Sequence, residues 1–295
     1  MSTFLSDFSD ALAAHVAQAA KATVAITLPH HLPLSAILWR KGIVVTSEQV
    51  LAEGDAYTAV LPGGAKARAK LVGRDAGTNV AAFTLDADGP AWERSPGVAV
   101  GELAVLVGAD GEGGPTARLG MVRKLGPAWT SLAGGKIDRL VVLDATLRPD
   151  TEGGPVIDAR GRLVGLSTSG PRGRAMVIPY ETVERVLEPL LREGRVARGW
   201  LGVSVQPVAL PEALRVLAGR EAGLMLAGVA KDGPAEKAGL LPGDIILDLD
   251  GKPVGNAHGL SRMFGPDRIG QAVALRILRA GEIRETSVTV GARPT

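Results

Sequence analysis

Short apolar runs separated by turn-forming residues dominate the sequence from residue 23 to residue 168. Asp-x-x-Gly and Gly-Gly sequences punctuate these runs, and each run is short enough for one strand. A succession of strands at a spacing of about 8–12 residues predicts a β-barrel or a β-sandwich. The expected strands cover residues 24–28, 37–39, 43–46, 56–61, 67–72, 80–85, 103–107, 119–122, 139–144, 155–158 and 163–167.

Two segments repeat their apolar positions at helical spacing instead. An amphipathic helix is expected over residues 3–20, within an N-terminal segment 1–22 that packs against the body of the protein. A second helix is expected over residues 180–192, and Gly194 follows it as a stop signal. The apolar positions are Phe4, Leu5, Phe8, Leu12 and Val16 in the first helix, and Val183, Val186, Leu187, Leu190 and Leu191 in the second.

A short polar connection at residues 194–198 leads into a second unit. This unit begins with alternating apolar and polar positions and contains two expected helices, at 212–218 and 258–264. Its mixture of strands and helices is enough for one small domain. The chain is therefore expected to fold as a mainly β domain at 23–195 followed by a smaller α+β domain at 198–295.

Composition narrows the class of protein further. The 295 residues are 46% hydrophobic and 22% charged, which is typical of a soluble globular chain that buries a large core. The count of zero cysteines excludes disulfides, thiolate zinc sites and a cysteine nucleophile. With 33 basic and 31 acidic side chains, the net charge of +2 lacks the basic excess that nucleic acid or an anionic membrane selects.

The sequence gives no signal for a metal, a cofactor or a membrane span. The four histidines are dispersed, and no pair has the i, i+4 spacing of a helical zinc site. The apolar run at 98–109 is interrupted by Glu102 and is too short to cross a bilayer. The first residues lack a basic segment and carry Asp7 and Asp10, so no signal peptide is expected and the location is predicted to be cytoplasmic. A leader that has been removed is the alternative.

Three segments carry a more specific pattern: GIVVTSEQVL at 42–51, KLVGRDAGTNVAAFTL at 70–85 and LDATLRPDTEGGPVIDARGRLVGLST at 143–168. In this order and spacing they resemble the catalytic segments of the HtrA (DegP-like) family of trypsin-type serine proteases. The resemblance extends over nearly the whole chain. It implies two six-stranded β-barrels with a cleft between them, followed by a PDZ domain.

The three triad positions of the resembling family hold other side chains here. The family's histidine, aspartate and serine fall on Gln49, Asn79 and Glu152, and a glycine beside the oxyanion pocket falls on Asp150. A carboxamide cannot take the proton of a nucleophile, and a carboxylate is a poor acyl-transfer nucleophile. Two negative charges would also stand where an oxyanion has to be stabilised. The chain is therefore predicted not to be an enzyme but a catalytically inactive pseudoprotease of that family.

Other groups offer weaker routes to hydrolysis. Asp150 and Glu152 could act as a pair of carboxylates, but nothing in the sequence positions a water molecule between them. Ser167 and Ser169 lie in GLSTSG, which lacks the strand-to-helix context of a nucleophile elbow. A serine-type endopeptidase that uses residues outside the triad positions stays open as an alternative.

The second domain retains features of a peptide-binding module. Its segment WLGV resembles the carboxylate-binding loop of PDZ domains, in which glycine lets successive N–H groups converge on an anion. The strand that follows would offer an edge to an incoming peptide, and the helix at 258–264 would form the opposite wall. The candidate peptide-binding residues are Trp200, Leu201, Gly202, Val203, Val205, Leu260, Met263 and Phe264, of which Leu201, Val203 and Leu260 can equally be core residues.

These features together predict a scaffold, adaptor or holdase. Its expected partners are protein C-termini or unfolded, extended peptides, which the PDZ domain binds by strand addition. A regulatory subunit that supplies this domain to an active HtrA paralogue is an alternative, as is the endopeptidase. The resemblance also implies a homo-oligomer, for which the family's trimer is the expected form.

Overall fold

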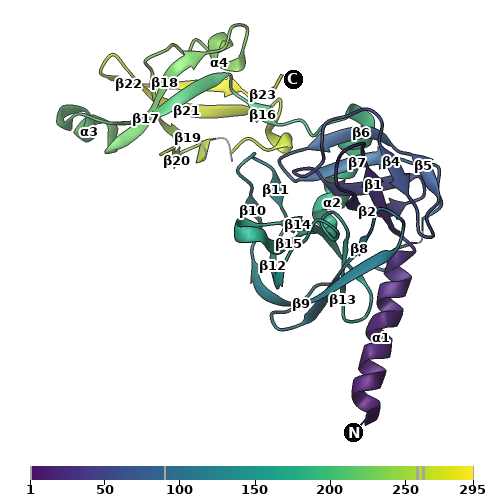
Figure 1. Cartoon of the computed structure of the whole chain (residues 1–295). Helices are drawn as coiled ribbons and strands as arrows, with labels where there is room; N and C mark the ends of the chain where they lie inside the picture. Colours follow the sequence, from purple (N-terminus) through teal and green to yellow (C-terminus); the bar gives the residue numbers. More distant parts are fainter. Residues whose placement is uncertain (1, 90, 257–258, 261–262, 295) are drawn as a thin grey trace. The chain divides into compact units, whose positions relative to one another are not determined.

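The chain forms two compact units, Met1–Val196 and Ala197–Thr295. The structure is a computed structural model, and it describes residues 2–89, 91–256, 259–260 and 263–294. Strands outnumber helices in both units (Figure 1). The mainly β class predicted from the pattern of apolar runs is therefore confirmed.

Seven strands form the first sheet of the N-terminal unit, in the order β5-β4-β1-β2-β3-β7-β6. They are β1 (Thr23–Thr27), β2 (Leu34–Arg40), β3 (Ile43–Ser47), β4 (Thr58–Val60), β5 (Lys66–Arg68), β6 (Lys70–Asp75) and β7 (Val80–Thr84). The single strand expected over 67–72 is divided at Ala69, which is 1% exposed and donates its N–H to the Tyr57 carbonyl oxygen. Because β5 and β6 lie at opposite edges, this sheet has seven strands instead of the six expected.

Six strands close into a barrel in the second half of this unit, in the order β12-β15-β14-β13-β8-β9. They are β8 (Leu103–Ala109), β9 (Pro115–Gly126), β12 (Leu140–Thr146), β13 (Pro155–Asp158), β14 (Leu163–Ser169) and β15 (Arg174–Pro179). Two short strands, β10 (Trp129–Thr130) and β11 (Lys136–Ile137), form a separate pair. The 3₁₀ turn η1 (Pro171–Gly173) joins β14 to β15. This barrel has the strand number that the resemblance implies.

Helix α2 (Tyr180–Glu193) packs against both sheets of the N-terminal unit. Its buried apolar residues share one cluster with residues of β3, β7, β14 and β15. The helix ends at Gly194, whose left-handed φ of 70° lets its N–H donate to the Leu190 carbonyl oxygen at 3.0 Å. The predicted helix and its stop are confirmed, and the shared cluster fixes the strand ends that carry the candidate site.

Helix α1 (Ser2–Ala20) precedes the first strand. Leu12 and Val16 in its second half pack on an apolar cluster formed by β8 and β13. In its first half, Phe4 and Leu5 are 74% and 70% exposed. Figure 1 shows this half of the helix extending past the barrel strands. The prediction that the whole apolar stripe packs on the body is therefore wrong for these two residues.

A six-stranded antiparallel sheet forms the C-terminal unit, in the order β17-β18-β19-β21-β22 with β20 beside β19. Its strands are β17 (Val203–Ala209), β18 (Ala222–Val229), β19 (Ile245–Leu249), β20 (Lys252–Pro253), β21 (Ala272–Arg279) and β22 (Glu282–Thr289). The short strands β16 (Gly199–Trp200) and β23 (Gly291–Ala292) pair with each other, and the helical elements are α3 (Glu212–Ala218), α4 (Pro234–Lys237) and η2 (Pro266–Arg268). The helix predicted at 212–218 is confirmed by α3. Strand β17 lies at an edge of the sheet.

The helix expected over 258–264 is described only in part. Gly259 and Leu260 are helical, whereas residues 258, 261 and 262 lie outside the described residues. The Gly259 N–H donates to the side-chain oxygen of Asn256 at 2.6 Å, as at the start of a helix. The full length of this helix stays a prediction.

Candidate functional site

Three side chains that the sequence predicts at one site lie together in the N-terminal unit. Gln49 follows β3, Asn79 precedes β7, and Glu152 lies in the turn before β13. The backbone N–H of Gln49 donates to Asn79 Oδ1 at 2.6 Å. The Gln49 side-chain Nε2 donates to Glu152 Oε1 at 2.8 Å, across 103 positions of the chain. The two halves of the unit therefore meet through these hydrogen bonds.

Strand β14 supplies a further wall of this site. Gln49 Nε2 lies 3.0 Å from Thr168 Oγ1 and 3.1 Å from the Ser169 carbonyl oxygen. Asn79 Nδ2 donates to Thr168 Oγ1 and, at 3.2 Å, to Ser47 Oγ. Neutral amides and hydroxyls thus surround one carboxylate. We call this network the polar cluster, and it consists of Ser47, Gln49, Asn79, Glu152, Thr168 and Ser169.

The carboxylate of Glu152 is buried, with the residue only 6% exposed. Besides Gln49, the Ser169 N–H donates to Oε1 at 3.2 Å, Ser169 Oγ donates to Oε2 at 2.9 Å, and Ser47 Oγ lies 3.4 Å from Oε1. The ion pairs identified among the described residues involve other carboxylates. The negative charge of Glu152 is therefore held by neutral donors alone.

The turn that carries Glu152 is held by internal hydrogen bonds. The N–H groups of Thr151 and Glu152 both donate to the Arg148 carbonyl oxygen at 3.0 Å. The Asp150 carbonyl oxygen accepts the Ser35 hydroxyl at 2.8 Å. Among the described residues, Asp150 Oδ1 is buried without a hydrogen-bond partner. Because these N–H groups have internal acceptors, they are not directed at a tetrahedral oxyanion in this arrangement.

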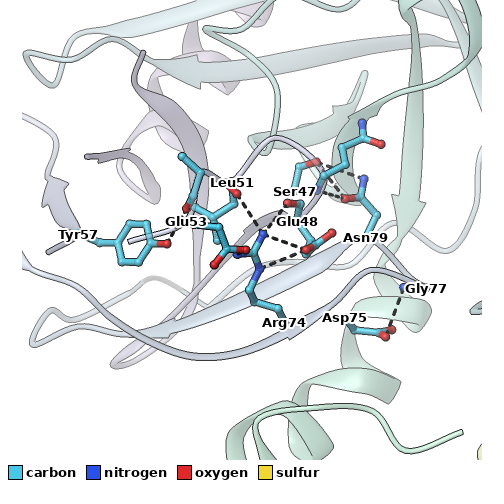
Figure 2. A network of polar contacts seen from close by, with 11 residues as sticks. Ser47, Glu48, Leu51, Glu53, Tyr57, Arg74, Asp75, Gly77 and Asn79 are labelled. Carbon is cyan, nitrogen blue, oxygen red and sulfur yellow. Dashed lines mark hydrogen bonds and ion pairs between the residues drawn. The ribbon is translucent and has the colours of Figure 1, made fainter. Parts of the chain in front are cut away.

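A second polar network orients the segment that carries Gln49. Arg74 on β6 donates from Nε to Glu48 Oε1 at 3.1 Å and from Nη1 to Glu53 Oε1 at 2.8 Å. Its Nη2 donates to the Leu51 carbonyl oxygen at 3.0 Å, and Figure 2 shows all three contacts converging on one guanidinium. Arg74 therefore fixes the loop after β3 to the sheet on both sides of Gln49.

The turn before Asn79 is shaped by Asp75. Its Oδ2 accepts the N–H of Thr78 at 3.0 Å and the Thr78 hydroxyl at 2.6 Å. Its Oδ1 accepts the N–H of Gly77 at 3.3 Å (Figure 2). This Asx-type turn leads into Asn79, whose φ of 58° lies in the left-handed region that asparagine tolerates better than most residues. Local chemistry thus directs the Asn79 amide toward the polar cluster.

Several members of these networks were beyond prediction from the sequence. Ser47 and Thr168 lie within the motif segments at 42–51 and 143–168, but nothing in those segments marks them as partners of Asn79 and Glu152. Arg74 and its acceptors lie in segments whose contact depends on the pairing of β6 with β7. Only the folded sheet brings the guanidinium under the loop after β3.

In the C-terminal unit, the loop between β16 and β17 contains the WLGV segment. The carbonyl oxygens of Leu201 and Gly202 accept the N–H groups of Ala235 at 2.8 Å and Ala230 at 2.7 Å. The N–H groups of Leu201 and Gly202 have no internal acceptor among the described residues. Gly202 has a φ of 80°, and a Cβ added there would lie 3.2 Å from the Trp200 ring. The loop therefore holds two adjacent N–H groups without partners, as anion-binding turns do.

The other candidate peptide-binding residues divide by burial. Three are at most 5% exposed and belong to the apolar core of this unit: Leu201, Leu260 and Phe264. Three are partly buried and pack against the same core: Val203, Val205 and Met263. Contact of these six side chains with a peptide stays a prediction.

Within the described residues, no three His, Asp or Glu side chains gather closely enough to hold a metal ion. No described helix combines the length and the apolar character needed to cross a lipid bilayer. The titratable side chain within the polar cluster is Glu152, so proton transfer in this cluster has to pass through its carboxylate.

Comparison with known proteins follows the division into two units. The family model described as "Trypsin-like peptidase domain" matches residues 34–166, and the one described as "PDZ domain" matches residues 199–290. A Brucella suis protein named "Probable periplasmic serine endoprotease DegP-like" is 33% identical over 269 residues, which are 88% of this chain and 52% of the relative. A Rhizobium meliloti protein of the same name is 29% identical over 264 residues, 86% of this chain and 52% of the relative. The chain thus spans about half the length of the curated relatives it matches.

Solved structures match over both units. The structure named "HtrA-type protease AlgW with tripeptide" is 31% identical, with a TM-score of 0.71, and the match covers 96% of this chain and 97% of that one. The structure named "HtrA-type protease AlgW with decapeptide" is 28% identical, with a TM-score of 0.73, and the match covers 96% and 99%.

Two predictions from the sequence are wrong on this comparison. The chain is predicted not to be an enzyme, whereas relatives at 29% and 33% identity are named serine endoproteases. That prediction rested on the side chains of Gln49, Asn79 and Glu152, whose chemistry does not decide how neighbouring groups such as Ser169 react. The chain is also predicted to be cytoplasmic, whereas the relatives are named periplasmic. That prediction rested on the composition of the first residues alone.

The fold and the sequence comparisons lead to the same family. The barrel unit and the α+β unit match the trypsin-like peptidase and PDZ family models in the same order along the chain. A solved HtrA-type protease of which this chain covers 97% is 31% identical to it. The fold class implied by the resemblance is thereby confirmed. The chain belongs to the HtrA family of trypsin-like serine proteases with a C-terminal PDZ domain.

Proposed function

We propose that the chain binds free C-termini and extended peptides through its PDZ domain. The observation that carries this proposal is the pair of N–H groups of Leu201 and Gly202, which have no internal acceptor among the described residues. A terminal carboxylate is an anion that two adjacent N–H groups without internal acceptors can bind. The names of the matched AlgW structures, which include a tripeptide and a decapeptide, support peptide binding by this family.

The edge strand β17 provides the second half of the binding mode. It pairs with β18 on one side, from Val203 opposite Val229 to Ala209 opposite Ala222. On its other side β17 pairs with no strand of the described residues, so an extended peptide can add there as a further strand. Main-chain hydrogen bonds then supply affinity, and the carboxylate fixes the register of the last residue. Such capture suits an adaptor, a holdase or the delivery of a chain to the barrel domain. The relatives' names support a periplasmic place of action.

A peptide with a free C-terminus is expected to bind the full chain at least about tenfold more tightly than its C-terminal amide, because charge-assisted hydrogen bonds contribute about 1.5–3 kcal/mol. Gly202→Ala is expected to remove most of this preference, since its Cβ would press on the Trp200 ring. Fluorescence anisotropy with labelled peptides measures both effects.

The matched control for this experiment is Gly281→Ala. Gly281 has a φ of 86°, close to the 80° of Gly202, but a Cβ there would meet no atom within 4 Å. Both variants pay the cost of a left-handed alanine, so only Gly202→Ala should change peptide binding. Equal affinity for the acid and the amide in the wild-type chain would contradict the proposed function.

A second candidate function, peptide-bond hydrolysis in the barrel domain, is favoured by one contact and by the names of the relatives. Ser169 Oγ donates to Glu152 Oε2 at 2.9 Å, within the reach of a nucleophile and its base. In this scheme, Glu152 takes the proton as Ser169 Oγ attacks the carbonyl carbon, and returns it to the leaving amine when the C–N bond breaks. Water then hydrolyses the acyl-serine. The turn before β13 has to free its N–H groups to stabilise the oxyanion.

Labelling with a fluorophosphonate probe tests this second candidate. The wild-type chain is expected to carry the probe on Ser169, and Ser169→Ala is expected to lose the label completely. Ser287→Ala, a serine change on β22 of the other unit, is expected to label like the wild type. A wild-type chain that takes up no probe, or a label that persists in Ser169→Ala, would rule this mechanism out.

A further inference from the structure

A pocket of about 470 Å³ lies beside the polar cluster in the N-terminal unit. The end of β1, the segment before β2, the loop after β3 and the turn before β13 form its walls. Most of its lining is apolar, and it includes Ile26, Leu28, Leu34, Leu51 and Tyr57. Its volume is in the range of pockets that hold small ligands or single side chains. Peptide binding by the PDZ domain does not involve this pocket, and the hydrolysis considered above involves only Glu152 of its lining.

Glu152 belongs to the lining of the same pocket, and its buried carboxylate is held by the polar cluster beside it. Neutral donors hold it, and the ion pairs of the described residues leave its charge without a cation. A bound cation stabilises a buried carboxylate that has no ion-pair partner. The net stabilisation is largest when other contacts compensate part of the cost of desolvating that cation. His30 and His31 also line the pocket, and neither forms an ion pair with Glu152 among the described residues. The pocket thus combines mainly apolar walls with two imidazoles and one carboxylate residue.

We propose that this pocket binds the side chain of a lysine or arginine in an extended peptide. The aliphatic stem of such a side chain packs along the leucine wall, and its cationic head reaches the Glu152 carboxylate. A metal ion does not fit this chemistry, because no three ligand side chains gather within the described residues. The peptide site of the PDZ domain plays no part in this proposal, so the two stand or fall separately.

The probes that test the proposal are two blocked peptides, acetyl-Ala-Ala-Lys-Ala-Ala-amide and its norleucine analogue. Both lack a free carboxylate, so the loop between β16 and β17 does not discriminate between them. Isothermal titration of the full chain is expected to show at least about tenfold tighter binding of the lysine peptide, as a charge-assisted contact implies. Glu152→Gln is expected to remove this preference.

Three further variants separate the pocket from indirect effects. Val50 lines the pocket and is 45% exposed, so Val50→Phe fills it without disturbing the core and is expected to weaken both peptides. Glu112→Gln removes an exposed carboxylate outside the pocket and is expected to change neither. Ser169→Ala is expected to keep the lysine preference, since that hydroxyl donates to the carboxylate without carrying its charge.

The thermal unfolding midpoint of each variant confirms that the fold is retained. Equal binding of the two peptides to the wild-type chain would overturn the proposal. A lysine preference that survives Glu152→Gln would do the same. Should Glu152→Gln fail to fold, undiminished binding of the lysine peptide to Val50→Phe would still refute a site in this pocket.

Discussion

Gly153→Ala is expected to lower the free energy of unfolding of the N-terminal unit by about 2–5 kcal/mol, through left-handed strain and overpacking together. Gly153 has a φ of 84°, and a Cβ there would lie 2.2 Å from both the Ser35 carbonyl oxygen and Thr46 Oγ1. The Ser35 oxygen cannot give way freely, because it accepts the Thr46 hydroxyl at 2.6 Å. The turn that carries Glu152 has to move instead, and the polar cluster moves with it.

Gly101→Ala provides the matched control for this change. Gly101 has a φ of 94°, and a Cβ there would meet no atom within 4 Å. It is therefore expected to lose only the about 1–2 kcal/mol of a left-handed alanine. Amide hydrogen exchange in β2 and β3 of the full chain measures both variants. If amide exchange were accelerated equally in Gly153→Ala and Gly101→Ala, the close contact of the added Cβ at position 153 would have no effect on stability.

Asp248→Ala is expected to lower the free energy of unfolding of the C-terminal unit by about 3 kcal/mol, the loss typical of a broken buried ion pair. Asp248 on β19 is 5% exposed and accepts Arg220 Nη2 at 2.6 Å and Arg276 Nη1 at 2.9 Å. Removing the carboxylate leaves two guanidinium groups close together without their shared acceptor. Amides of β18, β19 and β21 are expected to exchange on the order of 10²-fold faster.

The effect of Asp248→Ala should depend on pH in one direction. Burial raises the pKa of Asp248, but hydrogen bonds from Arg220 and Arg276 outweigh burial, so the pKa lies below its ordinary value. A lowered folded-state pKa gives stability that is present above the unfolded pKa of about 3.9 and is lost as the pH falls through the folded value. The difference in the free energy of unfolding between the wild type and Asp248→Ala is therefore expected to be constant above about pH 5 and to shrink below about pH 4.

The control for the second prediction is Glu221→Ala in the same unit. Glu221 is exposed and precedes β18, and surface changes of this kind cost at most about 0.5 kcal/mol. If amide hydrogen exchange at neutral pH were as slow in Asp248→Ala as in Glu221→Ala, the role assigned to the Asp248 carboxylate would be contradicted. If the difference in the free energy of unfolding between the wild type and Asp248→Ala grew as the pH fell, the direction of the pKa shift would be contradicted.

Prediction from the sequence succeeded for the features that depend on residues close together along the chain. The alternation and spacing of apolar runs gave the mainly β class, and the stripe from Val183 to Leu190 gave α2. Gly194 marked the C-terminal end of α2, because glycine readily adopts the left-handed backbone conformation that ends this helix. These features depend on neighbours a few positions away, so they can be read along the chain.

Prediction failed where the outcome depends on distant contacts. Ala69 divides an apparent single strand because its N–H is taken by Tyr57, a residue of another loop. Phe4 and Leu5 stay exposed although they continue the apolar stripe of α1. The sequence also gave no reason to count Ser169 as the partner of Glu152, since the two are brought together by the pairing of β13 with β14.

By itself, the sequence determined the class of the two domains and their order along the chain. It could do so because strand periodicity, helix stops and motif spacing are encoded within short segments. Only the tertiary structure decided what surrounds Glu152: a hydroxyl at 2.9 Å from its carboxylate, an amide from the other sheet and a mainly apolar pocket to whose lining the residue belongs. The physical reason is that charge compensation and burial are properties of groups that meet in space, and they cannot be read from positions along the chain.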